Sequence, residues 1–199
     1  MKLKVINKFN HSYGWRNGLM GFMRKLQKNL QIARADEIAR RYLVMNGFDG
    51  ALTTLGVIMG AYFAGLVEAK IILSAGLGAS MAMGISGAWG AYMAEKAERT
   101  RSIKELEKAL FTSLENSVIE RSSRIAITFI AFIDALSPVC ASIISLSPFI
   151  LSLTGILSTD SAITLAFILN MATLFSLGIF LGRISKTSVW LHGGLMVLA

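Results

Sequence analysis

The sequence contains a single cysteine, Cys140, and two histidines that lie far apart along the chain. A single cysteine excludes an intrachain disulfide bond and a metal cluster held by several thiolates. Two distant histidines argue against a zinc site and against a hydrolase that depends on histidine. The sequence also has neither a glycine-rich phosphate loop followed by Lys-Ser or Lys-Thr nor an HExxH motif. Because no catalytic set is present, we do not expect an enzyme.

Charged residues are scarce as well, at 16% of the 199 residues, compared with about 25% in a typical soluble domain. Hydrophobic residues make up 54% of the chain and gather in runs long enough for membrane-spanning helices, which need about 20 residues each. The net charge of +8 does not indicate nucleic acid, because the basic residues flank these apolar runs. The N-terminal sequence lacks the apolar stretch of a cleavable signal peptide. We therefore expect an all-α integral membrane protein of the cell membrane.

The apolar runs predict about five transmembrane helices, of which the fifth is truncated. The stretch from Val189 to Ala199 is apolar, but it is too short to cross a bilayer at about 1.5 Å per residue. It is either a truncated fifth span, which we favour, or a short interfacial tail. Pro138 is expected to kink the third span, and Pro148 is expected to mark its far end. The expected organisation is a basic arm at residues 1–41, two spans within 42–94, a cytoplasmic helical insert at 95–124, and two spans with the start of a fifth within 125–199.

The basic residues predict how the chain is oriented in the bilayer. From Leu19 to Ala33, apolar residues recur at helical spacing with lysine and arginine between them, which predicts an amphipathic helix lying in the membrane interface. Every Lys and Arg of the chain except Lys70 falls in the arm, in the insert or in the loop after the fourth span. Because basic loops stay in the cytoplasm, we expect a cytoplasmic N-terminus.

Two aspartates stand inside the apolar spans, where an ionised side chain costs about 2.5–3.5 kcal/mol at the helix centre. Asp49 lies in the first span and is the leading functional candidate, as a residue that faces protein, water or a cation. The alternative is a structural aspartate that bonds to a neighbouring helix or lies near the headgroups. Asp134 lies in the third span. It is either a proton carrier that alternates between charged and neutral forms or a hydrogen-bonded structural acid.

Methionine and glycine are the other unusual features of the first two spans. Met83 is one of ten methionines, and its thioether is either a soft ligand for a transition metal or a filler of apolar space. Gly56 and Gly60 have the spacing that lets helices approach closely, and the glycines around Gly87 share a face that can pack against a partner or line a path. The glutamates of the insert, Glu105 among them, either gather a divalent ion or form a solvated face with salt bridges.

Four patches of the sequence stand out in order: NGFDGALTTLGVIMG in the first span, AGLGASMAMGISGAWGAYMAEKAE in the second, DALSPVCASIISLSPFIL in the third, and WLHGGLMVLA at the start of a fifth. Together they resemble the vacuolar iron transporter family, in its short prokaryotic, archaeal-type branch. The resemblance implies five spans and a homodimer with the ion path at the dimer interface. It also implies proton-coupled export of Fe²⁺ or Mn²⁺ from the cytosol.

Asp49 corresponds to the path aspartate of that family, whereas two other path positions differ. Ala79 stands where the family has a glutamate, and Gly87 stands where it has a methionine. Met83 lies one turn before Gly87 on the same helix face and can supply the soft contact instead. The insert lacks the dense glutamate repeats of the family, and Glu105 is among their best remnants.

We therefore predict a transporter of divalent transition metals, with Asp49, Met83 and Glu105 as metal ligands and Asp134 as a proton carrier. A bound cofactor is not expected, because the metal ion is the cargo. The alternative is a non-transporting membrane scaffold or assembly protein, in which the glycine faces serve oligomer packing and the cytoplasmic helices bind a partner. Loss of the family's glutamate and methionine favours this alternative, whereas a buried and unpaired Asp49 would oppose it.

Overall fold

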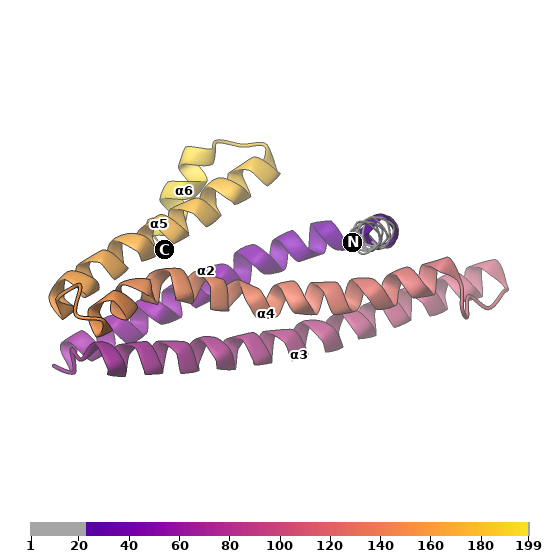
Figure 1. Ribbon diagram of the computed structural model, residues 1–199. Helices are drawn as coiled ribbons and strands as arrows, with labels where there is room; N and C mark the ends of the chain where they lie inside the picture. Colours follow the sequence, from indigo (N-terminus) through magenta and orange to yellow (C-terminus); the bar gives the residue numbers. More distant parts are fainter. Residues whose placement is uncertain (1–22, 199) are drawn as a thin grey trace, which may run out of the picture.

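The computed structural model describes residues 23–198, which form helices joined by short turns without β-strands (Figure 1). Four helices are long and apolar enough to cross a membrane, and a fifth is apolar but shorter. They are α2 (Ala35–Phe63), α3 (Ala69–Leu110), α4 (Val118–Leu153), α5 (Thr159–Ser185) and the short α6 (Val189–Leu198). The prediction of an all-α membrane protein is confirmed for these residues, while the fifth span stays a prediction.

The central helix is α4, which packs against α2, α3 and α5, while α6 packs against α5 (Figure 1). Glycines let the neighbouring helices lie directly on α4. A Cβ added to Gly76 would lie 2.8 Å from the Leu146 side chain, and one added to Gly84 would lie 2.9 Å from the Ala135 carbonyl oxygen. The buried apolar side chains form three clusters along α4, which include Ile130, Ala141 and Phe149 in turn.

The helix α2 begins at Ala35, well before the expected start of the first span at residue 42. Asp36 and Glu37 lie in its first turn, where acidic side chains interact favourably with the helix dipole. The helix ends at Phe63, and the chain then leaves the helix through Gly65, whose φ is +70°. Only glycine adopts that backbone conformation without strain. No helix-breaking residue stands at residue 42, so the basic end of the arm continues into the span.

The arm is helical over residues 23–32, and Arg34, with a φ of 48°, separates this helix from α2. The Ser122 hydroxyl of α4 donates a hydrogen bond of 3.1 Å to the Asn29 side-chain oxygen. Leu30 packs against the buried cluster at the start of α4. This part of the arm is therefore attached to the helix bundle. Residues 1–22 lie outside the described residues, so the interfacial position of the arm stays a prediction.

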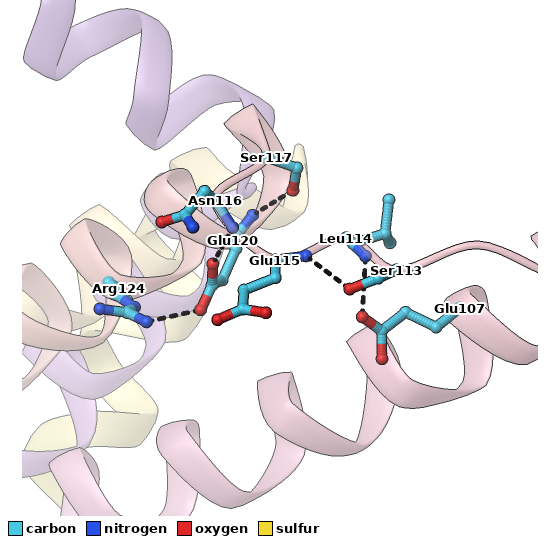
Figure 2. A network of polar contacts seen from close by, with 8 residues as sticks. All are labelled: Glu107, Ser113, Leu114, Glu115, Asn116, Ser117, Glu120 and Arg124. Carbon is cyan, nitrogen blue, oxygen red and sulfur yellow. Dashed lines mark hydrogen bonds and ion pairs between the residues drawn. The ribbon is translucent and has the colours of Figure 1, made fainter.

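The insert expected at residues 95–124 consists of the protruding ends of α3 and α4 and the turn between them (Figure 2). Glu107 accepts a hydrogen bond of 2.8 Å from the Leu114 amide. Glu120 accepts one of 2.7 Å from the Asn116 amide and pairs with Arg124 at 2.6 Å. α3 continues past the expected boundary at residue 95, and α4 continues past the one at residue 124, because neither position has a proline or glycine that would end the helix. These two glutamates hold the turn together.

Pro148 does not end the third span as expected, because α4 continues to Leu153. A proline inside a helix leaves the carbonyl four residues earlier without its N–H partner. The Ser147 hydroxyl compensates for this loss by donating a hydrogen bond of 2.8 Å to the Ile144 carbonyl. The helix therefore passes through Pro148 with its backbone groups satisfied.

Candidate functional site

Asp134 lies at a point where α2, α3 and α4 meet. Its side chain is buried, with only 2% of the residue exposed, and its carboxylate accepts a hydrogen bond from the Asn46 side-chain amide of α2. On the α3 side it faces Gly87, where an added Cβ would lie 2.8 Å from the carboxylate oxygen. Any larger residue at position 87 would displace the aspartate. We call Asn46, Gly87 and Asp134 the polar layer.

Pro138, one turn after Asp134, removes the N–H that would bond to the Asp134 carbonyl. No hydroxyl among the described residues takes the place of that donor, in contrast to Ser147 at the other proline. On the α2 side, Gly50 lies so close that an added Cβ would be 2.5 Å from the Pro138 Cα atom. Asp134 therefore contributes two groups to the helix junction, a carboxylate and a carbonyl released from the helix.

Asp49, one turn after Asn46, points away from the bundle and is exposed in the single chain. It has no hydrogen bond or ion pair with another described residue, so bonding to a neighbouring helix of the same chain does not explain its presence. Thr53, Gly56 and Gly60 follow it at helical spacing, and nothing lies within 4 Å of a Cβ added to either glycine. Asp49 and these three residues form what we call the open stripe of α2.

Met83 is half-buried on α3, one turn before Gly87. Because α2 and α3 are antiparallel, Asp49 and Met83 are displaced from the polar layer in the same direction. The displacement along each helix is about 4.5 Å for Asp49 and about 6 Å for Met83. The two side chains predicted to bind the metal are therefore at nearly the same depth, on neighbouring helices. Ala79 lies a further turn away on α3.

Glu105 is not brought near these residues. It lies 22 positions after Met83 on the same uninterrupted helix, which corresponds to about 33 Å along the axis. Its carboxylate pairs with Arg101 at 2.9 Å, and 63% of its side chain is exposed. Within residues 23–198 no group of three or more His, Cys, Asp or Glu side chains is arranged to hold a metal ion. The described residues therefore do not bring Glu105 together with Asp49 and Met83.

Sequence reasoning did not identify Asn46 as a site residue, although it stands three positions before Asp49. The available signal was an amide inside an apolar run, where each polar group needs a partner. Asn170 shows the same signal in α5, and its amide donates 2.8 Å to the Ala51 carbonyl and 3.1 Å to the Ser145 hydroxyl. These contacts fasten α5 to α2 and α4, so Asn170 has a structural explanation.

Comparison with known proteins gives two matches. A model of the VIT family matches residues 40–130, a range that includes Asn46, Asp49, Met83 and Gly87 and ends shortly before Asp134. The chain is also 35% identical over 164 residues to an uncharacterized protein of Methanocaldococcus jannaschii, and the match covers 81% of this chain and 82% of that protein. No solved structure matches the chain significantly.

Proposed function

Because this chain belongs to the VIT family, a family of membrane metal-ion transporters, we propose that it exports Fe²⁺ or Mn²⁺ from the cytosol in exchange for protons. The observation that carries the proposal is Asp49, an intramembrane carboxylate without a partner in its own chain. A carboxylate in this position is costly unless a cation, water or another protein surface meets it. Carboxylate oxygen together with the Met83 thioether suits a transition-metal ion of intermediate softness.

A second copy of the chain would complete the site. Gly56 and Gly60 leave the open stripe free of side chains, and small residues at this spacing let two membrane helices approach closely. Two copies packed through the open stripe would bring two Asp49 carboxylates and two Met83 thioethers toward one path. This arrangement explains why a single chain contains too few ligands for a metal ion.

Asp134 supplies the proton in this proposal. As a carboxylate it accepts the Asn46 amide hydrogen, and as a neutral acid it gains an O–H donor beside its remaining acceptor oxygen, so protonation changes the hydrogen bonding between Asp134 and Asn46. Asn46 lies one turn from Asp49 on α2. A change at the polar layer is therefore carried to the metal ligand through a single turn of helix. Pro138 makes α4 adaptable at the same level.

On the cytoplasmic side, Glu105 would collect metal ions before they enter the path. It lies about 33 Å from Met83 along α3, so it would be a metal-binding site separate from that of Asp49 and Met83. A metal ion would have to displace Arg101, whose pair with Glu105 is exposed and therefore weak. The excess of basic residues on this side of the spans supports a cytoplasmic N-terminus.

The test is metal flux into liposomes that contain the purified protein, measured with a metal-sensitive dye under a pH gradient. Asp49→Asn keeps the shape of the side chain and removes its charge, and Asp160→Asn, the same change at an exposed aspartate of α5, is the matched control. We expect gradient-dependent flux of Fe²⁺ or Mn²⁺ in the wild type and the control, and at least about a tenfold loss in Asp49→Asn, the equivalent of 1.4 kcal/mol. Flux that survives Asp49→Asn would remove the site from the proposal.

The second candidate is a membrane scaffold or assembly protein without transport. Ala79 and Gly87 at the metal positions favour it, as does the exposure of Asp49, since a buried and unpaired aspartate was the feature that would have opposed it. No flux of any divalent metal through correctly folded protein would favour this candidate over the transporter.

A further inference from the structure

A groove separates the start of α2 from the α5–α6 hairpin. In Figure 1 the hairpin diverges from α2 toward the end at which α2 begins. The groove between them has a volume of about 620 Å³. Its walls are apolar, and its polar end is formed by the first turns of α2. The lining residues are Glu37, Arg40, Arg41, Val44, Met45, Phe48, Leu181, Ile184 and Met196.

We propose that this groove binds one membrane phospholipid, with an acyl chain along Met45 and Phe48, the phosphate on Arg41 and a headgroup ammonium on Glu37. The apolar wall supports the tail position, because a groove beside membrane-spanning helices faces the acyl chains of the bilayer. From Arg41 to Phe48, α2 rises by about 10 Å. That length places the polar end at the level of the headgroups and the apolar wall at the level of the tails.

The charges at the polar end select the headgroup. Arg40 pairs with Asp36 at 3.1 Å, so its guanidinium already has a carboxylate partner within α2, although the pair is exposed. Arg41 has no ion pair among the described residues and lies over the Tyr42 ring, with 5.9 Å from its guanidinium carbon to the ring centre. An unpaired guanidinium at the membrane surface is suited to a phosphate, which it binds through two parallel hydrogen bonds.

Glu37 makes the site specific among phospholipids. Its side chain is exposed and has no ion pair among the described residues. A carboxylate near Arg41 repels a headgroup whose only charge is the phosphate and attracts one that also carries an ammonium group. The pair of opposite charges at one end of an apolar groove therefore matches a zwitterionic phospholipid with a primary amine. This assignment is independent of metal transport and of the orientation of the chain.

The experiment is native mass spectrometry of the purified full chain with added phosphatidylethanolamine, phosphatidylglycerol or diacylglycerol of equal chain length. We expect one phosphatidylethanolamine per chain, weaker binding of phosphatidylglycerol, and the weakest binding of diacylglycerol, which has no phosphate. Arg41→Ala should weaken phosphatidylethanolamine binding on the order of tenfold. The matched control is Arg183→Ala, an exposed arginine of α5 that does not line the groove.

Two further variants separate the parts of the proposal. Ile184→Trp narrows the groove from an exposed position opposite the first turns of α2, so it should exclude the lipid while the protein keeps its helical content by circular dichroism. Glu37→Gln should remove the preference for phosphatidylethanolamine over phosphatidylglycerol. Equal binding of diacylglycerol and phosphatidylethanolamine, or an Arg41→Ala variant that binds like Arg183→Ala, would overturn the site.

Other occupants of the groove give different results. If residues 1–22 fill it, their deletion will increase lipid binding. If a second copy fills it, dimers will carry less lipid per chain than monomers. Either result would overturn the proposal, because a phospholipid site predicts one lipid per chain in the full-length protein at every oligomeric state.

Discussion

Substituting Gly50 with alanine tests whether α2 lies as close to α4 as the structure indicates. The added Cβ would lie 2.5 Å from the Pro138 Cα atom and 2.6 Å from the Pro138 carbonyl oxygen. Both are backbone atoms, so no side chain can rotate out of the way. Gly56 provides the matched control on the same helix, because nothing lies within 4 Å of a Cβ added there.

Two effects of alanine on the free energy of unfolding are expected, one at both positions and one at Gly50 alone. Alanine is more favourable than glycine in a helix interior by about 1 kcal/mol, and this gain applies at both positions. At Gly50 the carbon atoms must separate to about 3.5–4.0 Å, which moves α2 away from α4 by about 1 Å. Overpacking of this kind costs about 1–3 kcal/mol. The free energy of unfolding of Gly50→Ala should therefore be about 1–3 kcal/mol lower than that of Gly56→Ala.

The measurement is thermal or denaturant unfolding of both variants in detergent, followed by circular dichroism. The protein should be dilute enough to be monomeric, because Gly56 belongs to the open stripe. Equal stability of the two variants would show that α2 and α4 are not in backbone contact at this point. The polar layer would then be wrongly placed too, since it depends on the same helix contact.

Two further predictions concern single carboxylates. Asp134→Asn keeps the contact with Asn46 but cannot carry a proton, so metal flux should lose its dependence on the pH gradient. The matched control is Asp160→Asn at an exposed position, which should leave flux and its dependence on the pH gradient unchanged. If Asp134→Asn also keeps that dependence, Asp134 is a structural residue. Glu120 lies in the hairpin beyond the membrane, where the hydrogen bond from Arg124 holds the pKa of its carboxyl below the ordinary value. Its contribution to stability is therefore present above the ordinary pKa of the carboxyl and is lost as the pH falls through the lowered one. Hydrogen exchange should show protection of the Asn116 amide declining over that pH range in the wild type, but not in Glu120→Gln.

The spans could be predicted from the sequence because length and hydropathy determine them. Which residues of each span face lipid and which face the neighbouring helices could not be predicted. In a soluble helix the polar side reveals the surface, but in a membrane helix both the lipid side and the protein side are apolar. The sequence therefore identified Asp49 as unusual without showing that it lies on the open stripe. The predicted ligand Glu105 lies far from Met83, because residues of the insert belong to a helix that continues straight out of the membrane.

The polar layer could not be predicted from the sequence for a different reason. Asn46 and Asp134 are 88 residues apart, and no local pattern records a contact between them. Gly87 was noted as a lost metal position, yet the structure gives it a second role as the space occupied by the Asp134 carboxylate. A methionine at this position would collide with Asp134 as the helices are now placed. The difference from the family pattern at Gly87 is thus connected with how α3 packs on α4.

The 42-residue length of α3 has a mechanical consequence. The helix contains no proline, whereas α4 beside it contains two. Helices bend sharply at proline and at Gly/Ser pairs, so a force applied to the turn after Leu110 would tilt the glycine-free part of α3, residues 91–110, as one rod of about 30 Å. α4 would instead flex at Pro138. The difference in stiffness would appear as relative movement of the two helices near Gly84 and Gly87, where the Val139 and Asp134 side chains of α4 lie against the glycines.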